Sequence, residues 1–589
     1  MLGASALAVL YNVYAFGQHR FFTADEYQYG HATWLVSKGE VPYLDFYEHH
    51  FPLSYVLHAP LVAGDASFPD RAQRLRLIAF AYILGASALL AFATFRTSHD
   101  ASAALLSLVI PPSVGFGLMS AVDYRADNFG AFLFLACLAL LELNRTSTNR
   151  RAGRPWLAAL AGVVLALSLL MTQKMVVLGA GSIGLLLAVD WFGRSPDRAA
   201  LVARPLSFCL ATGATLSVFL ALGAQQGLLG RGLEITIFEA IQHEAFYPAV
   251  SWREYALPYF CAAPLSTAAI ALCAFGYFAL APKAERIFWG VPIVVALLAG
   301  GLIKAQYPYN YVLLCFMLGL CAARGFSLAV KRLSSSSGTG RLRRAANFAP
   351  LLSIIPLAIL PSQIGFVSHT TSNEHQLELL AKIERFSGED DAVIDNSGGA
   401  LFRDHGSYFF HHGRAHRKMF EEYFSKQLVD DYRRSQALLW IIDYRLLDLP
   451  ETVQAYFMEH YIRVDGSLFA LGFQSPRSRG TELATDIDVI RSGDYFVFAA
   501  PERLSKRPVA LEPPERAFDL RVDGEPVLGD RVHLEVGAHR VTTLAGAPAY
   551  FLSLVPPDAF LLDEKDRFWR ELGGAKPHQL FFEYGESCF

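Results

Sequence analysis

Two neighbouring carboxylates follow the first apolar segment of the chain, and their type and position suit acid–base chemistry. Asp25 and Glu26 lie in the run Phe-Thr-Ala-Asp-Glu-Tyr. Adjacent carboxylates at one small site couple their titrations, so we expect one to react while the other is turned away or hydrogen-bonded. Asp25 is our candidate general base for an acceptor hydroxyl or amine. The alternative is that Asp25 caps the following helix, because Asp is a preferred N-cap residue.

A second polar run, Glu48-His49-His50, stands at the head of the next apolar stretch. Polar groups at a membrane edge must stay wet or paired, so such a run favours chemistry or transport. His50 and Tyr55 are candidates for binding a substrate. Glu and His can ligate zinc, but adjacent residues rarely all reach one ion. We therefore expect no metal and no cofactor.

Further charged and aromatic residues interrupt later apolar runs: Arg125, Asp127, Lys174, Lys304, Tyr307 and Tyr309. Arg125 could orient a sugar or pair internally with Asp123 or Asp127, and we favour the internal pair. A Lys ammonium is a point charge suited to a phosphate. The alternative for Lys174 and Lys304 is that both snorkel to the membrane interface.

The elements that carry these residues are predicted to be membrane-spanning helices. The chain has 589 residues, 53% hydrophobic and 18% charged, as in a polytopic membrane protein. Apolar runs of about 16 to 22 residues can cross a bilayer. We predict about eleven spans, near residues 2–17, 75–95, 101–119, 128–143, 156–172, 175–192, 205–223, 257–280, 288–303, 309–323 and 347–364. The run 53–63 is too short to span and is expected to lie along the outer interface.

The distribution of Lys and Arg predicts the orientation. Alternate loops are basic, and the positive-inside rule makes these loops cytoplasmic: Arg96; Arg145, Arg150, Arg151 and Arg154; Arg194, Arg198 and Arg204; Lys283 and Arg286; and the cluster from Arg324 to Arg344. Asp25, Arg125, Lys174 and Lys304 then face outside. An odd number of spans also delivers the C-terminal region to the outer side. The net charge of −3 argues against a nucleic-acid partner, and the seven Cys residues show no zinc or disulfide pattern.

The region after residue 364 has the pattern of short helices and strands that is typical of a folded domain, and it is expected to be extracytoplasmic. Residues 374–386 and 449–461 have helical spacing, and 392–395 and 437–443 read as buried strands. From about residue 487, short alternating strands with turn signals predict a small β-sandwich. We therefore expect a transmembrane domain over 1–364 with its first outer loop at 18–74, an α/β region over 365–480, and a β-sandwich-like region with a tail over 481–589.

The first outer loop resembles that of the GT-C glycosyltransferases. The resemblance rests on an apolar span, Asp-Glu-x-x-Tyr from Asp25, an amphipathic helix ending in Gly-Glu-Val-Pro, and His-His-Phe-Pro-Leu-Ser-Tyr up to Tyr55. It is closest to the bacterial branch with the lipid A aminoarabinose transferases and the protein O-mannosyltransferases. Two later runs resemble the family more weakly. Met-Thr-Gln-Lys174 is similar to its Thr-Lys turn, and Lys304-Ala-Gln-Tyr-Pro-Tyr-Asn-Tyr is similar to its late Arg/Lys-Tyr segment. Many relatives have Lys before Pro-Pro-Leu, whereas this chain has His50-Phe-Pro-Leu.

The resemblance implies an enzyme of the bacterial inner membrane with Asp25 as the catalytic carboxylate, and we predict Glu26 beside it as a second catalytic residue. Such an enzyme moves a sugar from a polyprenyl-phosphate donor to a lipid, glycan or protein acceptor on the outer side. Lys174, Lys304 and His50 would stabilise the phosphate leaving group, and single displacement would invert the anomeric carbon. Membrane lipids surround the spans. The alternatives are a membrane transporter, which would show internal repeats, and a non-catalytic envelope-assembly protein.

The orientation can be tested by labelling introduced cysteines in a variant that lacks the natural ones. A cysteine at Ser337 should be shielded from impermeant thiol reagents in intact cells, because its loop is predicted to be cytoplasmic, whereas one at Ser478 should be labelled. The opposite pattern would place Asp25 in the cytoplasm.

Overall fold

A computed structural model describes the chain over residues 2–113, 118, 120–146, 154–192, 198–239, 241–242, 246, 264–302, 307–336, 372–411, 413–442, 449–475, 481–499, 509–510 and 520–562. The chain divides into two compact units. Unit 1 holds Met1–Leu44, Glu48–Gly64 and Arg71–Glu374. Unit 2 holds His375–Phe589 together with two short segments of the first loop, Asp45–Tyr47 and Asp65–Asp70.

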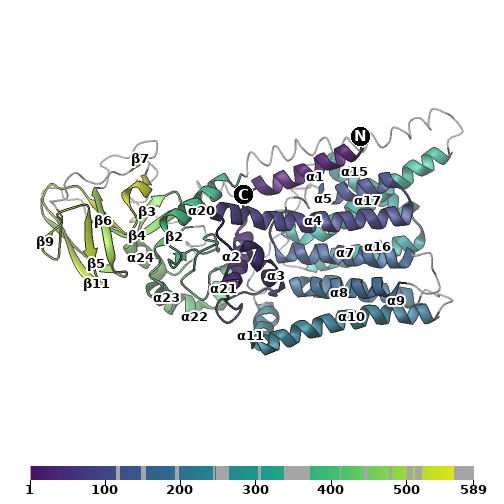
Figure 1. Cartoon of the computed structure of the whole chain (residues 1–589), viewed down its shortest axis with the longest axis horizontal. Coiled ribbons are helices and arrows are strands. Elements are labelled where there is room, and N and C mark those ends of the chain that lie inside the picture. The colour runs from purple at the N-terminus through teal and green to yellow at the C-terminus, as the bar shows by residue number, and fades with distance from the viewer. Residues whose placement is uncertain are drawn as a thin grey trace. The chain divides into compact units, whose positions relative to one another are not determined.

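Unit 1 is helical in its described residues (Figure 1). Its elements are α1 (Leu2–His19), α2 (Ala24–Lys38), α3 (Leu53–Val62), α4 (Phe68–Ser98), α5 (Ala101–Ser113), α7 (Ala126–Thr146), α8 (Pro155–Met171), η1 (Val176–Ala180), α9 (Gly181–Phe192), α10 (Arg198–Gln225), α11 (Leu228–Leu233), η2 (Glu234–Glu239), α15 (Pro264–Leu280), α16 (Lys283–Leu302), η3 (Pro308–Tyr311), α17 (Val312–Ser336) and α20 (Glu374–Phe386), the last of which enters unit 2 after its first residue.

The predicted spans coincide with helices wherever the structure describes them. Within the described residues, five helices are long and apolar enough to cross a membrane: Phe68–Ser98, Ala126–Arg145, Ala203–Gln225, Lys283–Gly301 and Tyr309–Arg332. The span predicted at 347–364 lies outside the described residues, so the total of about eleven stays a prediction. The short run after Pro52 forms α3, as expected. The chain is therefore a multi-pass α-helical membrane protein.

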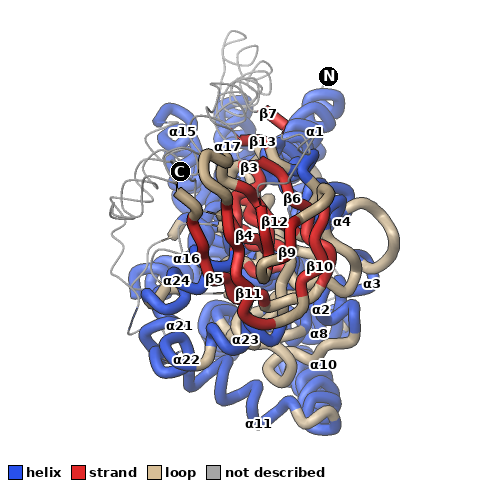
Figure 2. Tube along the Cα trace, turned by 90° about the vertical axis from the view of Figure 1, so that its left-hand side faces the viewer, coloured by secondary structure: helices blue, strands red, loops and turns tan. Residues whose placement is uncertain are grey.

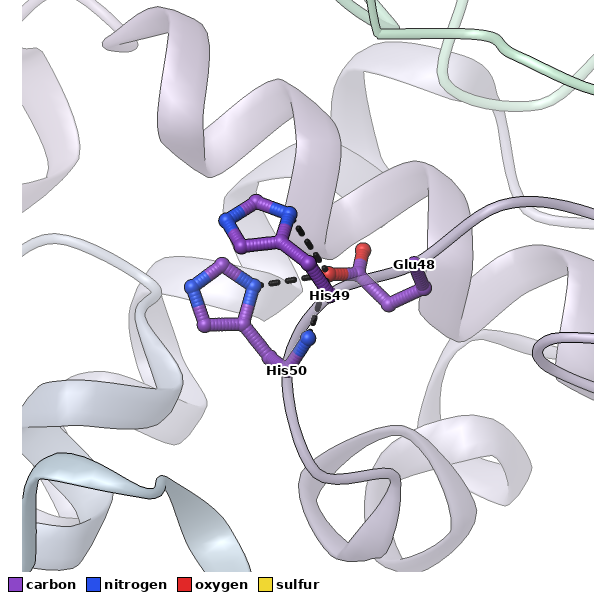
Figure 3. Close-up of side chains that lie close together, drawn as sticks. All are labelled: Glu48, His49 and His50. Atoms are coloured by element: carbon purple, nitrogen blue, oxygen red, sulfur yellow. Dashed lines mark hydrogen bonds and ion pairs between the residues drawn. The ribbon is translucent and has the colours of Figure 1, made fainter. Parts of the chain in front are cut away.

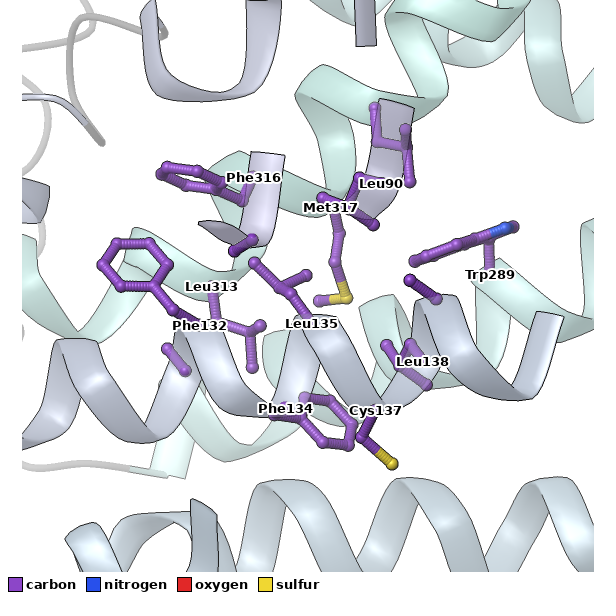
Figure 4. Close-up of a cluster of buried hydrophobic side chains, with 14 of the residues drawn as sticks. Leu90, Phe132, Phe134, Leu135, Cys137, Leu138, Trp289, Leu313, Phe316 and Met317 are labelled. Atoms are coloured by element: carbon purple, nitrogen blue, oxygen red, sulfur yellow. The ribbon is translucent and has the colours of Figure 1, made fainter. Parts of the chain in front are cut away.

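The core of unit 1 lies between α4, α7, α16 and α17. Phe132, Leu135, Phe316 and Met317 are at most 1% exposed and pack against one another in this core (Figure 4). The α7 and α17 spans are each 78% buried, whereas the α10 span is 6% buried. Helices buried on most of their surface are apolar all round, as expected for the centre of a bundle. The α7 and α17 helices are therefore the central pair.

Two local features fix the end of the bundle where α7 begins and α8 ends. Gly130 of α7 faces α8, and an added Cβ would lie 2.8 Å from Met175 Cγ and 2.9 Å from Thr172 Cγ2. A glycine is thus required for this close approach. After α8, Thr172 is extended (φ −156°, ψ 140°), and the chain resumes as the π-helix η1. Such irregular turns are frequent at functional sites.

The opposite end of α7 carries a buried ion pair. The guanidinium of Arg324 (α17) donates to both carboxylate oxygens of Glu142, at 2.6 and 2.7 Å. Trp289 Nε1 donates to Glu142 at 3.1 Å, and Arg324 also donates to Thr94 Oγ1. Glu142 lies about 22 Å along α7 from Asp127. These contacts join α4, α7, α16 and α17 at the end where Arg145 lies, which fits the predicted sidedness without testing it.

Unit 2 combines helices and sheets. Its further elements are β1 (Val393–Ile394), α21 (Arg414–Met419), α22 (Glu421–Lys426), α23 (Leu428–Ser435), β2 (Leu439–Ile441), α24 (Glu451–His460), β3 (Tyr461–Asp465), β4 (Leu468–Gln474), β5 (Leu483–Val489), β6 (Gly493–Ala499), β7 (Val509–Ala510), β8 (Leu520–Val522), β9 (Glu525–Pro526), β10 (Arg531–Leu534), β11 (Gly537–Thr543), β12 (Tyr550–Ser553), η5 (Pro557–Ala559) and β13 (Leu561–Leu562). The predicted helices at 374–386 and 449–461 and strands near 393 and 439 are confirmed.

The described strands of unit 2 form a seven-stranded sheet in the order β1-β2-β4-β12-β6-β10, with β3 paired to β4, and a four-stranded sheet in the order β5-β11-β8-β9 (Figure 2). A two-stranded sheet pairs β13 with β7. Tyr495 and Leu552 from the first sheet and Val489 and Val541 from the second share one core. The C-terminal part is thus sandwich-like, as predicted. The seven-stranded sheet continues across the boundary predicted at residue 480, however, because β12 joins β4 to β6.

The pair between Glu142 and Arg324 gives a stability prediction. Arg324→Met should destabilise the protein by about 3 to 5 kcal/mol, because it leaves the Glu142 carboxylate buried without its cation. Thermal unfolding of the detergent-solubilised protein measures this. Arg96→Met, at an exposed position near the end of α4, is the matched control. Equal unfolding temperatures for the two variants would contradict the prediction.

Candidate functional site

The helix of the first loop, α2, begins with a capping box that leaves Asp25 out. Thr23 is the N-cap: its hydroxyl accepts from Glu26 N, and the Glu26 carboxylate accepts from Thr23 N. Gly39 ends the helix with φ +98°, a left-handed conformation that favours glycine. The alternative that Asp25 is the N-cap residue is therefore wrong. Its carboxylate is available for other contacts and is 32% exposed.

Glu26 is buried in a set of structural contacts. Its side chain is 1% exposed and contacts Arg76 of α4, whose Nε lies 2.5 Å from Oε1. Arg76 also donates to Oε2 at 2.6 Å, and Tyr124 N donates to Oε1 at 2.9 Å. Glu26 thus joins α2 to α4 and to the loop before α7. Its predicted catalytic role stays a prediction, and its contacts are those of a residue that holds the loop in place.

Arg125 pairs with Asp25, which lies a hundred residues earlier in the chain. Its NH1 donates to the Asp25 carboxylate, and its NH2 lies 3.7 Å from Asp127 Oδ2. The predicted partner Asp123 instead pairs with Arg20 at the end of α1. Of the two predicted partners, Asp127 is therefore confirmed, whereas Asp123 is wrong because Arg20 occupies its carboxylate. Only the weaker contact to Asp127 remains of the predicted pairing.

Asp127 is held by the break after α8. Lys174 Nζ lies 2.6 Å from Asp127 Oδ2, and Thr172 Oγ1 donates to Oδ1 at 2.7 Å. Lys174 also donates to Asn310 of η3 at 3.3 Å. A Lys that only snorkels to the membrane interface needs no buried partner. The ion pair with Asp127 is therefore more than the snorkelling alternative for Lys174 requires. Lys174 remains 35% exposed and can meet a further anion.

Tyr309 of η3 lies against both cations. Its ring centroid is 3.6 Å from Arg125 Cζ and 4.7 Å from Lys174 Nζ. A cation over an aromatic face gains about 0.5 to 2 kcal/mol. Tyr307 stacks on Tyr309, with centroids 5.5 Å apart. The structure thus brings together Asp25, Arg125, Asp127, Lys174 and Tyr309, which come from four separate parts of unit 1.

The second polar run forms a hydrogen-bonded chain beside this cluster (Figure 3). His50 Nδ1 lies 2.7 Å from Glu48 Oε1, and His50 Nε2 lies 2.9 Å from the Tyr29 hydroxyl. Gln28 donates to both oxygens of Glu48 at 3.1 and 3.2 Å. Glu48 is fully buried. Because Arg125 lies 5.7 Å from the Tyr29 ring, this chain adjoins the charged cluster.

The same run has ligand atoms close enough for one metal ion. One atom from each of Glu48, His49 and His50 lies within 4.8 Å of the others. Both ring nitrogens of His50 are already engaged, with Glu48 and Tyr29. A metal would therefore have to replace a hydrogen bond that the buried Glu48 carboxylate uses. The expectation of no metal stays a prediction.

Several buried polar atoms near the cluster make no hydrogen bond within the described residues. They are Tyr55 Oη, Arg125 Nε and Gln173 Oε1. Tyr55 is fully buried and stacks on Tyr29 at 6.2 Å, while Gln173 Nε2 donates to His49 O at 2.9 Å. Buried polar groups are nearly always paired, so two donors and an acceptor left over at one place favour a polar ligand.

Electrostatics keep the cluster charged. Burial is the largest single effect and opposes the charge of Arg125, but the surrounding negative groups together, Asp25 first and Asp127 among them, outweigh it and raise the pKa of Arg125 well above its usual value. Burial, and then the Asp127 charge, raises the pKa of Tyr29 well above its usual value, so its hydroxyl stays neutral. Burial lowers the pKa of His58 to about 4, and neutral His58 holds the Tyr124 hydroxyl at 2.9 Å. Arg125 follows directly on this fixed tyrosine.

Of the predicted residues, Lys304 lies outside the described part of the chain. The sequence did not point to Gln28, Tyr29, Thr172, Asn310 or His58 as members of the site. Gln28 and Tyr29 follow Asp25 within the same helix, and Thr172 precedes Lys174 within the same turn. For these three residues, closeness in sequence to Asp25 or Lys174 was the signal that could have identified them as members of the site.

Comparison with solved structures identifies the fold. The apo form of ArnT from Cupriavidus metallidurans matches with a TM-score of 0.56 and 12% identity, over 80% of this chain and 96% of that chain. The same protein bound to undecaprenyl phosphate matches with a TM-score of 0.51 and 11% identity, over 80% and 97%. No family model and no curated protein sequence matches. The chain therefore has the GT-C fold that its first loop predicted, with a sheet-rich C-terminal region.

The contacts of Glu26 give a prediction that separates it from Asp25. Glu26→Gln should lower the free energy of unfolding by about 3 kcal/mol, because the buried Arg76 guanidinium loses its anion. Asp25→Asn should cost less, because buried Arg125 keeps the Asp127 carboxylate 3.7 Å away and the Asp25 carboxylate is itself partly exposed. Unfolding temperatures in one detergent measure both. A Glu26→Gln variant as stable as Asp25→Asn would show that the buried pair is not structural.

Proposed function

We propose that this protein is a membrane glycosyltransferase that transfers a sugar from a polyprenyl-phosphate donor to a lipid, glycan or protein acceptor. The observation that carries the proposal is the partly exposed Asp25 carboxylate in contact with Arg125, beside Lys174. A base and two cations at one place suit the two ends of a displacement, since the acceptor loses a proton and the phosphate gains charge. The fold supports the proposal, because the ArnT that shares it was solved with undecaprenyl phosphate bound.

The proposed reaction is a single displacement. The acceptor oxygen or nitrogen attacks the anomeric carbon, its proton passes to Asp25, and the bond from that carbon to the phosphate oxygen breaks. The electron pair leaves with the polyprenyl phosphate, and the anomeric configuration inverts. No metal is required in this scheme. Glu26 is proposed to act through position, by fixing the helix that carries Asp25.

The phosphate would lie between Arg125 and Lys174, which already share Tyr309 and Asp127 as neighbours. Tyr55 Oη and Arg125 Nε would supply hydrogen bonds that nothing in the described residues accepts. His50, Lys304 and Tyr307 are further proposed contacts. We place the site on the outer side of a bacterial inner membrane, because the loops on the opposite side are basic. A lipid carrier can present its head group there.

Asp25→Asn should abolish transfer while the protein still folds. Loss of a general base costs on the order of 10²-fold or more in rate. Mass spectrometry of envelope glycans compares cells that lack the protein with cells that carry it or the variant. Asp65→Asn removes the same charge at an exposed position in the same loop and is the control.

The expected result is that one glycan modification disappears without the protein, returns with the control and stays absent with Asp25→Asn. Full modification by Asp25→Asn would overturn the mechanism. Uptake of labelled sugar into vesicles without any change in the glycans would favour a transporter.

A further inference from the structure

The guanidinium of Arg125 can contact two anions: the Asp25 carboxylate, and a further anion bound at the same place. It is 4% exposed, donates to Asp25, and is clamped against the Tyr309 ring. Asp127 depends on it less than on Lys174, because Lys174 lies 2.6 Å from Asp127 while Arg125 lies at 3.7 Å. The positive charge of Arg125 is therefore directed mainly at Asp25. Any further anion at this place meets a cation that a carboxylate already holds.

A donor phosphate would be such an anion. Arg125 Nε is buried and has no acceptor within the described residues, so it offers a hydrogen bond beside the one that NH1 makes to Asp25. Two anions on one guanidinium repel each other, and in a buried site this repulsion is only weakly screened. Binding of the phosphate and ionisation of Asp25 must then oppose each other.

We propose that Asp25 and the donor phosphate compete for Arg125, so that the bound phosphate raises the proton affinity of the base. This proposal rests on the function proposed above. An unloaded site keeps Asp25 paired with Arg125 and weakly basic. A phosphate on Arg125 takes up part of that charge and makes the Asp25 carboxylate a better acceptor for a proton. The base therefore gains proton affinity only where a donor is bound.

The displacement itself uses the same contact. As the acceptor proton reaches Asp25, its carboxylate loses one negative charge. As the bond between sugar and phosphate breaks, the phosphate oxygen gains one. The negative charge therefore moves from one neighbour of Arg125 to the other, and a fixed cation that touches both stabilises the transition state without moving far.

Thermodynamic linkage between the ionisation of Asp25 and the binding of phosphate gives a prediction for phosphate affinity. If ionised Asp25 opposes the phosphate, its removal must favour the phosphate by the same coupling. Asp25→Asn should therefore bind polyprenyl phosphate roughly tenfold more tightly than the wild type, although it cannot transfer a sugar. The measurement is equilibrium binding of a fluorescent polyprenyl phosphate to the full chain in detergent. The matching polyprenol without phosphate is the ligand control, and Asp65→Asn is the protein control.

A double-variant cycle tests whether Arg125 is the link. In the Arg125→Gln background, Asp25→Asn should tighten binding much less, because the shared cation is gone and only the direct repulsion between the two anions remains. Asp25→Ser removes the same charge with a smaller side chain and serves if Asp25→Asn fails to fold. Equal or weaker binding by the neutral variants, or the same tightening without Arg125, would overturn the competition.

The outcomes separate this inference from the proposed function. If the wild type binds polyprenyl phosphate and polyprenol equally, the phosphate site itself is wrong and the function fails with it. If the wild type prefers the phosphate and the neutral Asp25 variants do not tighten, the donor class stands and only the competition is wrong. If binding tightens in Asp25→Asn and in Asp65→Asn alike, the effect is one of net charge, and the competition is again wrong.

Discussion

The arrangement of unit 1 depends on compensation of charge where little water reaches. Asp25, Asp127, Arg125 and Lys174 carry two negative and two positive charges, and each has an oppositely charged neighbour within the group. A buried charge without a partner costs several kcal/mol, so the buried Arg125 and Asp127 depend on the oppositely charged neighbours around them. The four residues belong to α2, the start of α7 and the break after α8, and Tyr309 of η3 covers the two cations. Any rearrangement of one element would separate a pair, so the need for neutrality holds the four segments together.

The same requirement explains the irregular backbone near this cluster. A continuous helix from α8 into α9 would not present Thr172 and Lys174 together to Asp127, whereas the extended Thr172 followed by the π-helix η1 does. The approach of α7 to α8 needs a residue without a side chain, which Gly130 supplies. At the other end of α7, Glu142 and Arg324 satisfy each other through a bidentate contact. The helices are thus fixed by polar pairs at both ends and by apolar packing between them, since lipid provides no hydrophobic force that would bring helices together.

The helices and the membership of the cluster could be predicted from the sequence far better than the pairing within it. Hydropathy marks the spans, and the alternation of basic loops puts Asp25, Arg125 and Lys174 on one side, because both signals are local. The main partner of Arg125 is not local: of the two near candidates, Asp123 is taken by Arg20 of α1 and Asp127 lies 3.7 Å away, whereas the closest partner, Asp25, lies a hundred residues away. The N-cap was misassigned for a different reason. Thr23 and Glu26 form a capping box, and this local pattern outranks the general preference of Asp for the N-cap position.

The tandem carboxylates show how one helix turn can serve two purposes. Successive residues of a helix point about 100° apart, so Asp25 and Glu26 cannot face the same neighbour. Glu26 points inward and accepts hydrogen bonds from Thr23 N, Tyr124 N and Arg76. These contacts lock the first turn of α2 and the start of the loop that leads to Arg125. Asp25, one position earlier, is thereby directed outward to Arg125 and to the partly exposed side. A single carboxylate could not both anchor the turn and accept a proton, because protonation would break the contacts that hold the turn in place.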